Sequence, residues 1–370
     1  MADTPAVAGL TPQQWDSKFY TEYFQKSLFK REMGTSENAI IQVKEDLSGK
    51  PGDSITYALV NKMSGAGVTG TATLEGNEEA IDTRSQKVTV VKRRNAFRVS
   101  EQDEAYSAIS LRQAGKTVLM NWAEENTRDR MIAAMASIDG VAYGTATEAQ
   151  KDAWLDNNTD RVLFGAAQSN LSTAAPAGGA TYDHSGSLAN VDGTNDKLTG
   201  SIATVMKRMA LTAAPKITPV TSASSGRRYF TAYVHPYTFR DLKSDPAIIA
   251  AQTGVSLRMQ NEKLFQGGDI EWEGIIFKEL DDIPVLSGVG ASSINVAPVY
   301  LCGAQALGYA IRRKWWSVDE QFDYQDKKGV SINAFDGIEK LRFGTDATVE
   351  TDVPKDHGIV TGFMACVADA

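Results

Sequence analysis

The sequence is poor in the residue types on which most enzyme and metal sites depend. Its 370 residues include two cysteines and three histidines, with no Cys-x-x-Cys, His-Glu-x-x-His or Gly-x-Ser-x-Gly motif. A structural zinc ion needs four closely spaced ligands, and most nucleophilic triads need a histidine. We therefore expect no metal site, no catalytic residue, no cofactor and no enzyme activity.

The cysteines and histidines that are present lie in contexts typical of structural residues. Cys302 and Cys366 are flanked by apolar residues in "VYLCGAQAL" and "GFMACVADA", which predicts buried free thiols. His184 lies in a segment rich in small residues, His235 precedes a proline at a strand end, and His357 falls in the turn-like "KDHG". We expect structural or exposed roles for all five.

Long apolar runs and blocks of one charge are also missing. No stretch approaches the roughly 18 apolar residues of a membrane span, and "MADTPAVAGLTPQQW" lacks the features of a signal peptide. The net charge of −8 gives no general attraction for nucleic acid, and the densest basic run is "VKRRNAFR" (91–98). "RRKWW" (312–316) combines basic and aromatic residues as single-strand binders do, but we interpret it as core aromatics with flanking charge.

Three glycines, Gly65, Gly67 and Gly70, form a G-x-G-x-x-G pattern after the strand-like "SITYALVNKM". A dinucleotide site needs the last glycine to open a helix, whose free N–H groups then meet the pyrophosphate. Here the next residues are "TATLEGNEEAID", in which threonines disfavour a helix start and acidic residues repel phosphate. A dinucleotide-binding enzyme is therefore the weaker interpretation of this motif.

Residues 54 to 94 instead read as one long hairpin-like arm. "SITYALV" predicts the outgoing strand and "SQKVTVVKRR" the returning strand, with glycines and acidic residues between them. An isolated two-stranded hairpin is only marginally stable in water. We therefore expect another subunit to cover part of this arm.

The N-terminal region predicts a helix that begins at Thr11 and Pro12. Trp15, Phe19 and Tyr23 follow at spacings of four residues and form one aromatic stripe. The stripe belongs either to the core or to an arm that docks on a partner, and the sequence leaves both interpretations open.

The rest of the chain alternates between helical and β patterns without a βαβ repeat. Residues 103–138 predict a long helix, with a weak point at Gly115, and residues 165–200 are rich in small polar residues and predict a flexible surface loop. "DKLTGSIATVMKRMALTA" and "PYTFRDLKSDPAIIAAQ" predict helices, while "RYFTAYVHP", "GGDIEWEGIIFKELDDIPVL" and the C-terminal hundred residues are mostly β. These patterns predict an α+β fold.

This order of parts resembles the major capsid proteins of tailed bacteriophages with the Hong Kong 97-type fold. The segment "GAGVTGTATLEGNEEAID" in particular, between "GDSITYALV" and "RRNAFRVS", is similar to a run that recurs in the extended loop of N-four-type podovirus capsid proteins. The sequence departs from that run at Met63-Ser64. The similarity covers roughly residues 10–140 well and 228–285 more weakly, and it leaves 165–200 unmatched.

The resemblance implies a division of the chain into named parts. They are an N-terminal arm (1–50), an extended β-hairpin loop (51–99), a peripheral domain with the spine helix (100–160), a flexible insertion (161–200), an axial domain (201–295), and a return to the peripheral domain with C-terminal strands (296–370).

The resemblance also implies a function and partners. We expect a major capsid protein that self-assembles as hexamers and pentamers into an icosahedral head around double-stranded DNA. Scaffolding, portal and decoration proteins would be partners, DNA contacts would not be sequence-specific, and assembly would take place in the cytoplasm of the bacterial host before the protein is found in the virion. An encapsulin-like compartment shell is the alternative within the same fold, and no scaffold segment is expected within the chain.

The candidate intersubunit residues follow from this resemblance. In the extended loop and the strand after it they are Gly65, Gly67, Gly70, Glu75, Glu78, Glu79, Asp82, Arg93, Arg94 and Arg98, the acidic and basic members on opposite sides of a contact; in the N-terminal arm they are Trp15, Phe19 and Tyr23.

Overall fold

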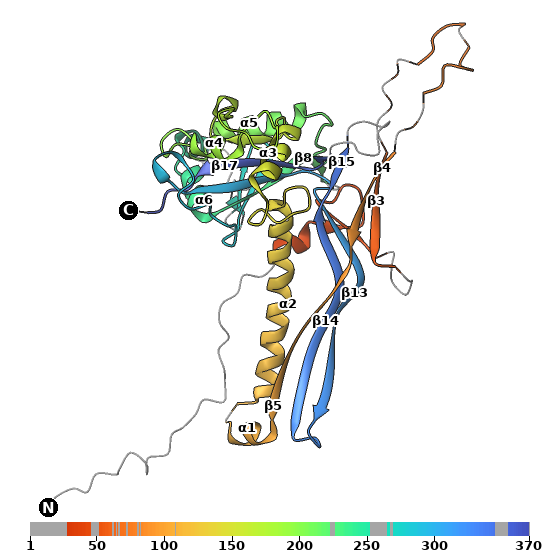
Figure 1. Cartoon of the computed structure of the whole chain (residues 1–370), viewed down its shortest axis with the longest axis vertical. Helices are drawn as coiled ribbons and strands as arrows, with labels where there is room; N and C mark the ends of the chain where they lie inside the picture. Colours follow the sequence, from red (N-terminus) through yellow and green to blue (C-terminus); the bar gives the residue numbers. More distant parts are fainter. Residues whose placement is uncertain are drawn as a thin grey trace, which may run out of the picture. The chain divides into compact units, whose positions relative to one another are not determined.

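The computed structural model describes residues 28–45, 52–60, 63, 65, 67–71, 73–79, 81, 83–107, 109–222, 226–251, 265–266, 269–344 and 354–369 (Figure 1). Its longer helices are α1 (Glu101–Tyr106), α2 (Leu111–Ala136), α3 (Glu148–Asn157), α4 (His184–Ala189), α5 (Gly200–Thr212) and α6 (Pro236–Lys243), with short 3-10 turns at Leu28–Arg31, Gln168–Asn170 and Ala291–Ser293. Its strands are β1 (Met33–Gly34), β2 (Ile41–Lys44), β3 (Ser54–Val60), β4 (Thr83–Thr89), β5 (Val91–Ser100), β6 (Val162–Phe164), β7 (Val220–Thr221), β8 (Arg228–Val234), β9 (Phe265–Gln266), β10 (Asp269–Trp272), β11 (Ile275–Glu279), β12 (Val296–Cys302), β13 (Leu307–Phe322), β14 (Lys327–Lys340), β15 (Arg342–Gly344), β16 (Pro354–Asp356) and β17 (Ile359–Ala365). The expected α+β fold is confirmed.

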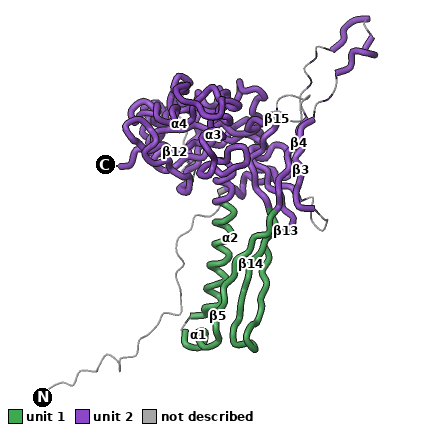
Figure 2. Tube along the Cα trace, viewed as in Figure 1, with its two compact units in different colours: residues 1–28, 91–128, 313–336 green, residues 29–90, 129–312, 337–370 purple. Residues whose placement is uncertain are grey.

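The chain divides into two compact units, which Figure 2 colours separately. Among the described residues, unit 1 contains Val91–Arg128 and Arg313–Asp336. Unit 2 contains Phe29–Val90, Asp129–Arg312 and Gly337–Ala370. Helix α2 and strands β13 and β14 therefore each contribute residues to both units.

Unit 2 is built on an eight-stranded mixed sheet in the order β6-β17-β12-β8-β11-β10-β9, with β7 paired to β8. Both faces of this sheet are buried. Phe230 of β8 joins a core cluster with Met206 of α5 and Phe239 of α6, whereas Tyr233 joins a second cluster with Met131 of α2. Burial on both faces explains why "RYFTAYV" reads as a continuous apolar run rather than an alternating one.

The expected hairpin is confirmed as the antiparallel pair β3–β4, with a register from Ser54↔Thr89 to Val60↔Thr83. Its base packs on its own unit, because Tyr57 and Val88 are buried with Phe343. The predicted returning strand was too long. It ends at Thr89, and the following residues form β5, which belongs to unit 1.

Unit 1 is a small antiparallel sheet covered by α2. Strands β5 and β14 pair from Val91↔Asp336 to Ser100↔Lys327. Leu119 and Ala123 of α2 are buried with Val330 and Ile332 of β14, and Phe97, Trp122 and Trp315 pack against them. The long amphipathic helix and the strand after the loop thus share one apolar core.

The long helix is interrupted at a different place from the one expected. It is continuous through Gly115 and breaks between Tyr106 and Leu111. Ser107 and Ser110 lie in the break, and their side-chain oxygens accept N–H groups of the next turn. Gly115 instead allows close packing, because a Cβ there would lie 2.5 Å from the Phe97 ring.

Residues 165–200 do not form the loose surface loop that the composition predicted. They contain α4, and His184 and Leu188 are buried. The buried Asp152 carboxylate accepts the N–H groups of Ala177 and His184, each at 2.7 Å. Carboxylate–backbone hydrogen bonds therefore organise a segment that offers few large apolar side chains.

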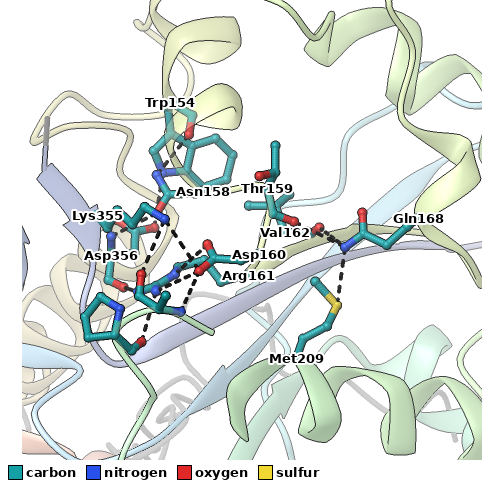
Figure 3. Close-up of polar contacts among 12 residues, drawn as sticks. Trp154, Asn158, Thr159, Asp160, Arg161, Val162, Gln168, Met209, Lys355 and Asp356 are labelled. Carbon is teal, nitrogen blue, oxygen red and sulfur yellow. Dashed lines mark hydrogen bonds and ion pairs between the residues drawn. The ribbon is translucent and has the colours of Figure 1, made fainter. Parts of the chain in front are cut away.

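Another buried polar network centres on Arg161, whose side chain is fully buried (Figure 3). Its guanidinium donates to the carbonyl oxygens of Asp356 and Pro215 and pairs with Asp160 at 3.2 Å. Lys355 also approaches Asp160, at 3.5 Å. These contacts tie the chain after α3 to the C-terminal strand β16.

None of the helices in the described ranges is long and apolar enough to span a membrane.

Candidate assembly surfaces

The loop between β3 and β4 is shaped by its own carboxylates. Glu79 accepts a hydrogen bond from the Gly65 N–H at 2.7 Å, which links the two sides of the loop. Glu78 accepts the Gly76 N–H at 2.8 Å. Two of the predicted intersubunit acids thus have intramolecular partners, and Glu75 lies exposed in the turn beside them.

The loop glycines allow bends in the backbone, and their surroundings differ from those of a phosphate-binding loop. Gly67 and Gly70 have φ angles of 69° and 71°, in the left-handed region that glycine adopts most easily. Gly70 is followed by a turn, not by the helix that a dinucleotide site requires. The interpretation of these glycines as bends in an arm agrees with this geometry.

The end of β3 and the loop after it also expose apolar side chains that the sequence reasoning missed. Val60, Met63, Leu74 and Ile81 are 63%, 52%, 62% and 64% exposed. Several large apolar side chains exposed close together are typical of a surface that is covered in an assembly. The missed signal was the placement of apolar residues on both sides of the acidic run.

Some of the predicted site residues lie outside the described residues. These are Asp82 of the loop and Trp15, Phe19 and Tyr23 of the N-terminal arm. Their roles therefore remain predictions.

The predicted basic residues all lie on β5, in unit 1. Arg93 pairs with the buried Asp336 of β14 at 3.6 Å. Arg94 and Arg98 line a surface pocket of about 600 Å³, together with Glu320 and Phe322 of β13. The loop acids belong to unit 2 and these arginines to unit 1, so no single unit brings the two sets together.

The same sheet carries an aromatic stack bounded by cations. The rings of Trp316 and Phe335 stack with centroids 5.9 Å apart, the Arg313 guanidinium lies 3.9 Å from the Trp316 ring, and Lys92 lies 5.6 Å from that of Phe335. Trp315, next in sequence, packs on Trp122 of α2 instead. The "RRKWW" segment therefore stabilises unit 1 through aromatic contacts on two faces.

The histidines have structural surroundings. Burial lowers the pKa of His184 to about 3 and that of His357 to about 4. The His184 ring lies among Tyr143, Trp154 and Phe363. The Nδ1 of His235 accepts the Tyr237 N–H at 3.3 Å and caps α6.

Three carboxylates, those of Glu148, Asp152 and Asp183, gather within 4.8 Å of one another. Both oxygens of Asp152 already accept backbone N–H groups, and Asp183 caps α4 through the Gly186 N–H at 2.9 Å. These hydrogen bonds hold the chain around α4.

Comparison with known proteins gives a consistent result. The family model described as "Phage capsid protein" matches residues 3–366. The major capsid protein of Pseudomonas phage KPP25 is 26% identical over 385 residues, which cover 97% of this chain and 96% of that protein.

Solved structures are similar over the whole chain. The capsid of cyanophage Pam1 matches with a TM-score of 0.85 and 30% identity, covering 100% of both chains. The capsid of Ralstonia phage GP4 matches with a TM-score of 0.74 and 19% identity, also over 100% of both chains. Phage head structures of the Hong Kong 97-type thus share this fold.

Proposed function

The chain belongs to the phage capsid protein family, and we propose that its copies form hexamers and pentamers of an icosahedral head around double-stranded DNA. It is a major capsid protein, a structural component of the virion and not an enzyme. The proposal rests on the extended loop, whose outer part exposes Leu74 and Ile81 beside an acidic run. A second copy supplies the surface that covers them.

We infer that the partner surface of the loop is the basic face of unit 1. The loop carries Glu75, Glu78 and Glu79, and the face carries Arg94 and Arg98 around a pocket large enough for apolar side chains. Opposite charges orient the contact, while the apolar side chains supply most of the stabilisation. Many such modest contacts add up in a symmetric shell.

Charge reversal tests this pairing. The double variant Arg94→Glu/Arg98→Glu is expected to reduce particle yield in light scattering, and a further Glu75→Arg change is expected to restore part of it. Arg208→Glu, on the exposed side of α5, is the matched control and should leave the yield unchanged. Normal particles from the double variant would refute this role of the basic face.

The finer assignments belong to the same proposal. We assign the chain to the N-four-type podovirus group on the "LEGNEE" run of the loop, and we expect scaffolding, portal and decoration proteins as partners and assembly in the host cytoplasm. The match to phage capsid proteins over residues 3–366 does not support the encapsulin-like compartment that was the alternative within this fold. Purified particles that hold double-stranded DNA are expected.

A further inference from the structure

Unit 1 has an open strand edge beside the pocket proposed for the loop contact, and Val318, Glu320 and Phe322 of this strand line that pocket. Strand β2 pairs with β13 only over residues 307–310, and β14 occupies the other side of β13. Over residues 313–322, no strand among the described residues pairs with the side away from β14. Val318 and Phe322 of this stretch are 44% and 41% exposed.

This edge is long and lacks two of the usual protections against strand addition, proline and bulges. Natural edges are kept short or carry proline, bulges or charges, and of these the edge carries only charged side chains such as Lys314. Residues 313–322, "RKWWSVDEQF", contain neither proline nor glycine and form one regular strand. Unpaired N–H and C=O groups along such an edge are a template for another strand.

One pair of charges along this edge is complementary to that of a second copy in the reverse direction. If two copies pair antiparallel with Ser317 facing Ser317, Lys314 faces the second copy's Glu320, and Trp316 faces its Val318. The reciprocal pairs form by symmetry, so Lys314 of each copy meets Glu320 of the other, and the remaining charges of the stretch face uncharged residues, so that no like charges meet. Trp315 and Asp319 contact α2. Because side chains alternate along a strand, the residues of the two facing pairs lie on the other side of the sheet, away from α2: Lys314, Trp316, Val318 and Glu320.

The opposite edge of unit 1 does not have this property. Strand β5 is last in its sheet, and no other strand in the described part of the chain pairs with its outer side. Its charged residues are all basic: Lys92, Arg93, Arg94 and Arg98. A twofold pairing through β5 would place like charges opposite one another, which is destabilising.

We propose that β13 edges of two copies pair antiparallel across a twofold axis centred on Ser317, joining their unit 1 sheets into one. This interface rests on the proposed shell function and adds to it a second contact between copies, made through the backbone edge of β13 rather than through the pocket proposed for the loop. Its symmetry is isologous, the commonest form of contact between identical chains.

A single cysteine tests this arrangement directly. At the axis, Ser317→Cys would face its own copy with Cα atoms about 4.5–5.5 Å apart, within disulfide range. Both native cysteines are buried, so the background is low. Gln321→Cys on the same edge is the matched control, because its two copies would lie roughly 27 Å apart at 3.4 Å per residue.

The readout is non-reducing electrophoresis of purified particles after mild oxidation. We expect at least about tenfold more disulfide-linked dimer from Ser317→Cys than from Gln321→Cys, which lies beyond disulfide reach. Intact particles without that dimer, or equal dimer from both variants, would overturn the strand pairing alone. If the unaltered chain forms no particles, it is the proposed function that fails.

Charge exchange provides a second readout. Lys314→Glu and Glu320→Lys should each lower particle yield, because each places like charges opposite one another twice. The double variant Lys314→Glu/Glu320→Lys should recover it, because opposite charges face again. A double variant that is no better than the single ones contradicts this register.

Discussion

The Lys340 ammonium lies 2.7 Å from the Asp356 carboxylate, and both side chains are almost completely buried. Trp154 donates its Nε1–H to the same Asp356 oxygen at 3.1 Å. Asn158 accepts the Asp356 N–H at 2.9 Å. This ion pair connects the end of β14 to β16 inside unit 2 and replaces apolar packing at that point.

Breaking this pair is expected to destabilise the chain strongly. Asp356→Ala leaves the Lys340 charge buried without its partner, and removing one member of a buried pair costs about 3–5 kcal/mol. Glu271→Ala is the control, because its partner Arg227 is 71% exposed and such surface pairs contribute less than about 1 kcal/mol. Thermal unfolding of the unassembled chain measures both, and equal midpoints would contradict a structural role for the buried pair.

Gly337 allows two backbone segments to approach each other. A Cβ at this position would lie 2.1 Å from the Thr89 carbonyl oxygen, where the hairpin ends. Gly337→Ala should therefore lower the free energy of unfolding by about 1–3 kcal/mol, the usual cost of overpacking. Gly144→Ala is the control, since nothing lies within 4 Å of a Cβ there. A Gly337→Ala variant as stable as the control in urea unfolding would disprove the close approach.

Acid should destabilise the fold through two histidines. Burial is the main cause of the low pKa values of His184, about 3, and His357, about 4. The positive charge of Lys151 lowers the pKa of His184 further, and that of Arg161 lowers the pKa of His357. In the unfolded chain a histidine has a pKa of about 6.5. Below that pH the unfolded state binds more protons than the folded state, so stability is full above pH 6.5 and is lost as the pH falls toward 4.

At pH 5 each histidine is expected to lower the free energy of unfolding by about 2 kcal/mol relative to neutral pH. Urea unfolding at pH 7.5 and pH 5 measures the loss, and His184→Phe should remove roughly half of the part that histidines cause. A pH dependence unchanged by this substitution would show that other groups cause the acid sensitivity.

Deleting residues 65–82 should separate folding from assembly. The base of the hairpin, which contains the buried Tyr57 and Val88, remains, so the thermal midpoint of the unassembled chain should stay close to that of the full chain. Stable shells should not form, because the exposed apolar and acidic part of the loop is gone. Normal particles from this deletion in electron micrographs would refute the role of the loop.

The hairpin and the long helix could be predicted because their patterns are local. Alternation in "SQKVTVV" and the glycine-rich turn region indicate two strands, and the spacing of Met131, Met135 and Ile138 indicates one helical face. Val118, which the same spacing places on the apolar face, is 57% exposed. The break before Leu111 was missed because serine side chains that accept backbone hydrogen bonds give no periodic signal.

The structure of residues 165–200 and the surroundings of the site residues were harder to predict from the sequence, for a physical reason. A carboxylate such as Asp152 looks the same in the sequence whether it is solvated or buried against backbone N–H groups. Lys340 and Asp356 likewise read as surface charges. The open edge of β13 depends on which strand pairs with which, and that information is not local.

Size measurement of the purified chain tests the central claim most directly. Light scattering and electron microscopy of the full chain, with any scaffold that it requires, should show closed particles of megadalton mass. A chain that stays a monomer of 40.0 kDa under these conditions and is missing from purified virions would contradict the account.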